Sequence, residues 1–377
     1  MELPPLGLYI HLPWCERKCP YCDFNSHETR DLPEAQYIDA LLQDLDADIP
    51  QLHQREVATL FIGGGTPSLF SAPGIARLLK ELGNRIALSP TLEATMEANP
   101  GSAEADKFAA FRAAGINRLS LGIQSFQDEQ LQALGRVHNS EQAHAAIDFA
   151  RAAGFDSFNI DLMHGLPGQG IESADADLRT ALSYQPAHLS WYQLTIEPNT
   201  VFHKRPPSLP VEDMLADIQD DGEHLLISNG LQQYEVSAYS QPGFECRHNR
   251  NYWSFGDYLG IGAGAHGKIT AQDGSIQRTA KRRQPGDYMS SAAGAFTAST
   301  RVLTRDEIPG EFMLNALRLN QGFTISLFES RTGLPISSIQ TQLEQLIDRG
   351  LLEQVESTIR TTALGRRFLD SVVAEFF

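Results

Sequence analysis

Three cysteines stand within eight residues near the start of the chain, in the run C-E-R-K-C-P-Y-C. The spacing from Cys15 to Cys19 to Cys22 lets one loop wrap three thiolates around a corner of a metal cluster, and thiolates are the ligands of iron–sulfur clusters. A zinc site normally closes four ligands around the ion, and the nearest fourth candidates are His27 and the distant Cys246. Three inert thiols are the remaining alternative. Because three thiolates leave one metal position free, the spacing favours a [4Fe–4S] cluster with an open iron.

Further candidates follow short apolar runs that are typical of strands. The run Gly63-Gly64-Gly65-Thr66-Pro67 would let a ligand approach the backbone closely and would expose amide donors to it. Glu97, Gln124, Arg136 and Asp161 stand at or just after the ends of later runs. Taken singly, each is more often a surface or capping residue. As a set at one edge of a sheet, they predict a small-molecule site.

The elements that must position these residues alternate between strands and helices. From Gly7 to about Pro198 there are six such rounds, which is typical of an α/β fold with a parallel sheet. The expected strands are Leu8–Leu12, Thr59–Ile62, Leu92–Glu97, Arg118–Gly122, Ser157–Leu162 and His188–Leu194, with helical patterns such as Pro33–Asp48, Ser102–Ala114 and Glu141–Ala153 between them. Strand ends of such a series converge, so the sequence predicts a partial (β/α)6 barrel with its site at the carboxyl ends.

The rest of the chain has a different pattern. A proline-rich link is followed by an expected helix from about Val211 to Asn229, and a glycine- and aromatic-rich segment comes next. From Arg301 onward, short helices, a strand pair and a last helix follow in the order of a winged-helix fold. This part has 8 basic and 10 acidic residues, which favours a structural or protein-facing module, with DNA contact as the alternative. The expected divisions are 1–235, a linking segment 236–300, and a C-terminal domain 301–377.

Composition restricts the partners. The 377 residues include 30 basic and 47 acidic ones, a net charge of −17 that would repel a phosphate backbone, so no nucleic-acid partner is expected. No apolar stretch approaches the roughly 18 residues of a membrane span, and the first residues lack the pattern of a secretory signal. Four cysteines of this spacing do not indicate a disulfide framework. The expected location is the cytoplasm.

The motif CxxxCxxC after the first strand of a six-fold β/α series resembles the radical-SAM superfamily. This resemblance implies that the open iron binds S-adenosylmethionine, which an electron from the cluster cleaves to a 5′-deoxyadenosyl radical. The match narrows to the oxygen-independent coproporphyrinogen III oxidase group, through YIHLPWC, FIGGGTPS, LGIQSF, NIDLMHGLPGQ and the C-terminal part. By matching position, the resemblance implies S-adenosylmethionine contacts at Tyr9, Tyr21, Gly64, Gly65, Thr66, Glu97, Gln124, Arg136 and Asp161.

Two features depart from the oxidase pattern. The oxidase motif continues as CxxxCxxCxC, whereas Phe24 stands at the fourth cysteine position, and residues 246–253 read C-R-H-N-R-N-Y-W. Members of the family with both features resemble heme chaperones. That resemblance implies binding of heme and its transfer to an acceptor protein, without porphyrin oxidation and with membrane contact only through the acceptor.

The chemistry of the second motif agrees with a heme site. His248 can be an axial iron ligand, and Tyr252 and Trp253 offer flat faces for a macrocycle. The alternative is that His248 is a hydrogen-bonded structural histidine and that the two aromatic residues belong to the core. At the level of function, the alternative is an S-adenosylmethionine-dependent coproporphyrinogen III dehydrogenase that performs two oxidative decarboxylations of propionate side chains.

Overall fold

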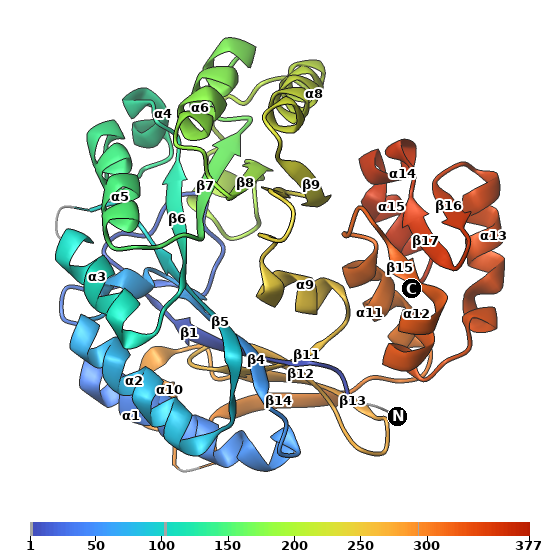
Figure 1. Cartoon of the computed structure of the whole chain (residues 1–377), viewed down its shortest axis with the longest axis horizontal. Helices are drawn as coiled ribbons and strands as arrows, with labels where there is room; N and C mark the ends of the chain where they lie inside the picture. The colour runs from blue at the N-terminus through green and yellow to red at the C-terminus, as the bar shows by residue number, and fades with distance from the viewer. Residues whose placement is uncertain (1–2, 102–103, 293) are drawn as a thin grey trace.

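The centre of the molecule is a curved, 12-stranded sheet (Figure 1). The computed structural model describes residues 3–101, 104–292 and 294–377. Six parallel strands lie side by side in chain order: β1 (Leu6–Leu12), β4 (Val57–Gly64), β5 (Leu88–Ala98), β6 (Arg118–Gln124), β7 (Phe158–His164) and β8 (His188–Gln193). The six strands expected from the sequence are therefore all present, and the α/β fold is confirmed.

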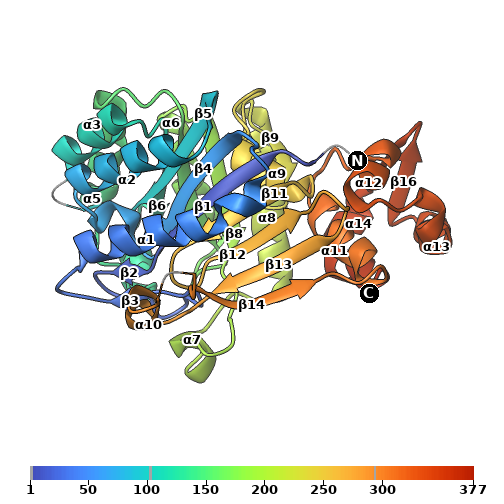
Figure 2. The same ribbon diagram turned by 90° about the horizontal axis from the view of Figure 1, so that it is seen from below.

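Helices cover the outer face of this sheet (Figures 1 and 2). They are α1 (Glu34–Asp48), α2 (Ala72–Arg85), α3 (Glu104–Ala114), α5 (Ser140–Ala152), α6 (Ile171–Ser183) and α8 (Glu212–Ser228). Ser102 and Ala103, where the helix expected over 102–114 begins, lie outside the described residues. None of the helices in the described part of the chain is long and apolar enough to cross a membrane.

The strands have one apolar face and one polar face because successive side chains point in opposite directions. On β4, Leu60 and Ile62 join the large core beneath the helices, and Leu119 and Leu121 do the same on β6. The residues between them point into the concave side of the sheet. This alternation leaves a row of polar groups there, opposite the helices.

The segment 236–300, expected as a link, is built into both ends of the sheet. The edge strands β9 (Gln232–Glu235) and β10 (Ala238–Ser240) extend it beyond β8, while β11 (Asp257–Ile261) pairs with β1 in parallel. Strands β12 (His266–Thr270), β13 (Ile276–Lys281) and β14 (Thr297–Val302) follow in antiparallel order. Antiparallel strands need no crossover helix, and within the described residues the connection from β13 to β14 contains only the short helix α10 (Pro285–Met289). This part therefore lacks the regular alternation of strands and long helices that marks the first six strands in the sequence. The three proposed divisions themselves stay a prediction.

The helix α9 (Arg247–Trp253) carries the C-R-H-N-R-N-Y-W motif and lies between the sheet and the C-terminal part (Figure 1). The shorter elements elsewhere are β2 (Trp14–Cys15), β3 (His27–Glu28), α4 (Asp128–Ala133), α7 (Val201–Lys204), α10 (Pro285–Met289) and the 3-10 helices η1 (Ile49–Leu52), η2 (Pro67–Leu69) and η3 (Ile336–Ile339).

The C-terminal part forms a small domain with its own apolar core. Its elements are α11 (Glu307–Ala316), β15 (Phe323–Thr324), α12 (Ile325–Thr332), α13 (Gln340–Asp348), β16 (Leu352–Val355), β17 (Thr358–Thr361), α14 (Ala363–Arg367) and α15 (Leu369–Ala374). The ring of Phe312 meets those of Phe323 and Phe328 edge to face, with centroids 5.0 and 5.1 Å apart. The order of helices and strands is the one expected for a winged-helix fold.

A buried charge cluster joins the edge of the sheet to α1. Lys281 of β13 donates hydrogen bonds to Asp44 Oδ1 and Asp48 Oδ2, both at 2.6 Å, and the Tyr288 hydroxyl donates to Asp44 Oδ2 at 2.7 Å. The Lys281 and Asp44 side chains are almost completely buried, and burial raises the pKa of Asp44. These groups depend on one another because an unpaired charge is costly in the interior.

We therefore expect Lys281→Met to lower the free energy of unfolding by about 3–5 kcal/mol, because it leaves Asp44 and Asp48 without their cation. The matched control is Arg282→Met, which removes a neighbouring exposed cation that donates a hydrogen bond to the Ala295 carbonyl at 2.8 Å. Chemical denaturation measures both variants. Equal losses of stability for the two would contradict the assignment.

Candidate functional site

A cavity of about 670 Å³ lies on the concave side of the sheet, within the volume range of small-molecule sites. All of the residues predicted as ligand contacts line it, except Tyr9 and His248. They are Cys15, Cys19, Tyr21, Cys22, Gly64, Gly65, Thr66, Glu97, Gln124, Arg136 and Asp161. Residues far apart in the sequence therefore meet in one place, as expected for the carboxyl ends of neighbouring parallel strands.

The cysteine loop is held against the end of the sheet by hydrogen bonds. Cys15 ends β2, which pairs with β3 through Trp14 and His27. Asn25 donates to the carbonyls of Ala263 and Arg283 at 2.8 and 2.9 Å, and His11 Nε2 lies 2.9 Å from the Asn25 carbonyl. Asn25 and His11, for which the sequence suggested no role, thus fix the loop in position.

All three thiols of the loop are free. Burial raises the pKa of Cys15 and of Cys22. Within the described residues, no three His, Cys, Asp or Glu side chains are close enough together to hold a single metal ion. A cluster of four irons binds each thiolate at a different iron, so it does not need three sulfurs to meet at one point.

Arg136 stands beside the loop and is buried in the cavity wall. Its Nη1 lies 3.6 Å from Cys19 Sγ, and its Nη2 donates to Asn99 Oδ1 at 2.7 Å and to the Gly122 carbonyl at 2.8 Å. Its Nε has no hydrogen-bond partner. One guanidinium therefore provides positive charge next to a thiol and keeps a donor for a further group.

Three amides of the glycine run are engaged within the chain. The amides of Gly64, Gly65 and Thr66 donate to Glu97 Oε2, the Leu12 carbonyl and the Trp14 carbonyl, at 3.1, 2.8 and 2.7 Å. These donors are occupied within the chain and are not free for a ligand. The glycines instead allow close packing: Gly64 has φ +122, and a Cβ on Gly65 would lie 2.4 Å from the Trp14 carbonyl oxygen.

Two half-buried carboxyl groups line the cavity and form no ion pair. Asp161 accepts hydrogen bonds from Ser120 Oγ at 2.9 Å and Asn159 Nδ2 at 2.6 Å, whereas Glu97 accepts the Gly64 amide. Neither forms an ion pair with any residue of the described ranges. Burial, with a further contribution from Asp161, raises the pKa of Glu97 to about 7. Both can accept hydrogen bonds from hydroxyl or amino groups of a ligand.

Gln124 ends β6 in a strained conformation. Its φ is +70, which is uncommon for a residue other than glycine, and its Oε1 accepts a hydrogen bond from the Tyr192 hydroxyl at 2.7 Å. Such strain is common at binding sites because the surrounding structure holds the residue in place.

Tyr9 and His248 lie behind the cavity wall. The Tyr9 hydroxyl is 2.9 Å from His11 Nδ1, and its ring stacks on Phe61. His248 is 1% exposed, with Nδ1 2.9 Å from Thr59 Oγ1 and Nε2 2.8 Å from the Tyr252 hydroxyl. Both ring nitrogens of His248 are therefore engaged, so iron coordination would require one of these contacts to open. The roles assigned to the two residues stay predictions.

Several cavity residues were missed in the sequence. Asn99, Ser120, Asn159 and Tyr192 line the wall together with the predicted set. Three of them stand two or four residues from a predicted one, namely Asn99 from Glu97, Ser120 from Gln124, and Asn159 from Asp161. Strand alternation alone could have identified these three.

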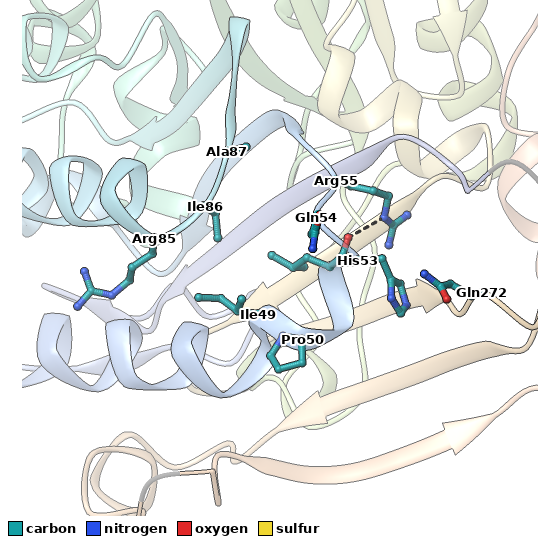
Figure 3. Close-up of a pocket in the computed structure, with 10 residues that line it drawn as sticks. Ile49, Pro50, His53, Gln54, Arg55, Arg85, Ile86, Ala87 and Gln272 are labelled. Carbon is teal, nitrogen blue, oxygen red and sulfur yellow. Dashed lines mark hydrogen bonds between the residues drawn. The ribbon is translucent and has the colours of Figure 1, made fainter.

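A second cavity, of about 710 Å³, lies at the other end of the sheet, between η1, the end of α2 and Gln272 (Figure 3). Both of its arginines are already paired. Arg55 donates to Asp257 Oδ2 at 2.7 Å and to the Pro4 carbonyl at 3.0 Å, and Arg85 donates to Asp46 Oδ1 at 2.9 Å. It contains none of the predicted site residues.

Because the pKa of Glu97 is raised, the free energy of unfolding of the ligand-free protein should depend on pH. The pKa moves from 4.5 to about 7 on folding, so the wild-type chain loses stability as pH rises through this window. Glu97→Gln avoids that loss. We expect the unfolding free energy of the variant, relative to wild type, to be higher at about pH 8 than at about pH 5, by on the order of 3 kcal/mol. Denaturation at both pH values measures this difference, and an unchanged difference would refute the assignment.

Comparisons with known proteins agree with the site and the fold. Residues 9–181 match the radical SAM superfamily, and residues 303–368 match the HemN C-terminal domain. The solved structure of coproporphyrinogen III oxidase (HemN) from Escherichia coli is 28% identical, with a TM-score of 0.85, and the likeness covers 99% of this chain and 90% of that one.

Closer similarity is found among proteins called heme chaperone HemW. The chain is 49% identical to the one from Escherichia coli (strain K12), over 100% of this chain and 99% of that protein. It is 33% identical to the one from Bacillus subtilis, over 98% of both chains. The mouse protein called radical S-adenosyl methionine domain-containing protein 1, mitochondrial, is 35% identical over 97% of this chain and 86% of its own length. The chain therefore belongs to the HemW family of radical SAM proteins.

Proposed function

We propose that this protein binds heme and passes it to an acceptor protein. We also propose that it carries a [4Fe–4S] cluster on Cys15, Cys19 and Cys22 and binds S-adenosylmethionine at the open iron. The observation that carries this proposal is the full-length identity of 49% to a heme chaperone, in a chain that has all three motif cysteines. The reducing cytoplasm, where we expect the protein to act, would keep these thiols available.

The residue at position 24 separates the proposal from its alternative. Likeness to the coproporphyrinogen III oxidase structure favours porphyrin oxidation. The sequence, however, has Phe24 where the oxidase pattern has a fourth cysteine, and this side chain is 63% exposed at the wall of the cavity. A phenyl ring cannot provide the thiol that the oxidase has at this position.

The cavity has the donor set that the two cofactors need. Three free thiols line it, and Arg136 adds a cation 3.6 Å from Cys19 Sγ. When bound, the cluster would supply an electron. For S-adenosylmethionine, the free Nε of Arg136 suits the carboxylate, while Glu97 and Asp161 suit the amino group and the ribose hydroxyls. Gln124, Tyr21 and residues 64–66 would form the walls around them.

We expect the protein reconstituted under anaerobic conditions to contain about four irons and four sulfides per chain. Changing Cys15, Cys19 or Cys22 to Ala should abolish the cluster, because each thiolate binds one iron. Cys246→Ala is the matched control, since Cys246 is buried away from the loop and should leave the cluster intact. Iron and sulfide analysis with the visible absorption spectrum measures this. Zinc in the purified protein, or a normal cluster in Cys22→Ala, would contradict the proposal.

For heme, we expect about one equivalent to bind per chain, and His248→Ala to weaken binding or change the Soret spectrum, since an axial bond is lost. Tyr252→Phe is the control: it keeps the ring but frees the Nε2 of His248 from its hydrogen bond, so it should not weaken binding. Identical spectra and affinities for wild type and His248→Ala would remove His248 as the ligand.

A separate assay decides between carrier and oxidase. The protein with cluster and S-adenosylmethionine is incubated anaerobically with coproporphyrinogen III, and the products are analysed for protoporphyrinogen IX. We expect none, because the fourth cysteine is absent. Decarboxylation at a catalytic rate would establish the alternative function instead.

A further inference from the structure

The cavity continues well past the proposed cluster and cofactor site. Along β6, the residues that line it are Arg118, Ser120, Gly122 and Gln124, which share one face of the strand. Six residues of strand separate Arg118 from Gln124, or about 20 Å. The end of the cavity at Arg118, here called the deep end, is therefore a separate place from the end at the cysteines.

Arg118 is buried with two unpaired nitrogens. Its exposed fraction is 3%, it lines the cavity, and both its Nε and its Nη2 lack a hydrogen-bond partner. These two nitrogens form the side-on edge of the guanidinium, which binds the two oxygens of a carboxylate in parallel. A buried cation with a vacant edge is costly unless something pairs with it.

Other donors at the deep end are also vacant. Trp253 Nε1 and Arg318 Nε are buried without partners, and both residues line the cavity. The guanidinium of Arg318 lies over the Trp253 ring, 4.4 Å from its centroid. Three side chains, from β6, α9 and the C-terminal part, thus bring unpaired N–H groups to the wall of one cavity. Arg118 faces Cys246, at the start of α9, and Tyr234, which is next to the Glu235 partner of Arg318.

The acidic groups nearby are occupied elsewhere. The acidic groups that face Arg118 are Cys246, Glu93, Tyr234 and Asp161. Burial raises the pKa of Cys246 and of Tyr234, so both are uncharged near neutral pH. Glu93 Oε1 accepts the amide of His248 at 3.1 Å, and Glu235, also at this end, accepts from Arg318 Nη2 at 3.1 Å. None of these groups forms a hydrogen bond with Arg118 that would fill its vacant edge.

We propose that the deep end binds a carboxylate of a small ligand, held side-on by Arg118 with Trp253 Nε1 as a further donor. If the protein binds heme, as proposed above, this carboxylate is one of the heme propionates. A free short-chain carboxylate has the same chemistry and is the other source. In this proposal Trp253, the last residue of the motif C-R-H-N-R-N-Y-W, donates a hydrogen bond to the ligand from the cavity wall. This role is separate from any role of His248.

The site also connects two parts of the molecule. Trp253 ends α9, whereas Arg318 follows α11 of the C-terminal part and is tied to Glu235 of β9. A carboxylate seated here would contact both, so its binding would tighten the contact between the sheet and the C-terminal part.

The test uses the full-length protein with its cluster. Affinities for heme and for heme dimethyl ester, which lacks the free carboxylates, are measured in wild type, Arg118→Gln and Trp253→Phe. Arg179→Gln removes an exposed cation on α6 and is the matched control. In a second arm, sodium propionate is added while the indole N–H signal of Trp253 is followed by NMR. That signal is assigned by its loss in Trp253→Phe.

We expect wild type and the Arg179→Gln control to prefer heme over its dimethyl ester by about 30-fold or more, and Arg118→Gln to lose most of this preference. Sodium propionate should shift the Trp253 signal in wild type but not in Arg118→Gln. If the propionate arm responds while heme and its ester bind alike, the ligand is a free carboxylate.

Failure of wild type to bind heme would count against the proposed function, but the propionate arm would still decide this inference. If Arg118→Gln changes neither the heme preference nor the propionate response, the deep end is not a carboxylate site. Folding of Arg118→Gln is checked by its cluster content. Should that variant not fold, Trp253→Phe replaces it, and an unchanged heme preference there overturns the proposal.

Discussion

The structure depends on one constraint: the central strands pack apolar side chains against the helices on one face and line a polar cavity with the other face. Leu60 and Ile62 on β4 and Leu119 and Leu121 on β6 join the core under the helices. Glu97 on β5, Ser120 on β6 and Asp161 on β7 instead line the cavity on the concave side. Burial there raises the pKa of the two carboxyl groups. A one-residue shift of any strand would put charges into the core, so the same alternation fixes the register and builds the site.

This arrangement explains how distant segments form one site. The cysteine loop is held by Asn25 against the turn after β11, and Arg136 links Cys19 to the ends of β5 and β6 through Asn99 and Gly122. Two of these contacts join distant parts of the chain: Asn25 and Ala263 are 238 positions apart, and Arg136 and Cys19 are 117 positions apart. The site therefore forms only when the whole sheet, with its late strands, is in place.

Much of this could be predicted from the sequence because its signals are local. The six strands, the cysteine loop and the residues at strand ends follow from spacing and alternation. The strands β11–β14 could not be predicted in this way. β12–β14 pair in antiparallel fashion, and β11 pairs with β1, which lies far earlier in the chain. The amide partners of Gly64–Thr66 were missed because hydrogen bonds to Leu12 and Trp14 depend on tertiary contact. His248 shows the same limit: its burial against Thr59 is set by where α9 lies, which the motif does not encode.

The vacant donors in the cavity are informative because most of the polar groups around them are paired. His188 bonds both Asn159 and Tyr234, and Asn159 bonds Ser120 and Asp161, so this inner layer is well connected. Arg136 Nε and the side-on edge of Arg118 stand out against that background. Buried donors that lack a partner in an otherwise paired wall call for an explanation, and the proposed ligands would supply acceptors for them.

The central claim is that three thiolates hold a cluster whose open iron binds S-adenosylmethionine. Electron paramagnetic resonance of the reduced, anaerobic protein, before and after addition of S-adenosylmethionine, tests it most directly. We expect the signal of a reduced [4Fe–4S] cluster whose shape changes when the ligand coordinates the open iron. A cluster signal that S-adenosylmethionine leaves unchanged, or no cluster signal in protein with a full complement of iron and sulfide, would contradict it.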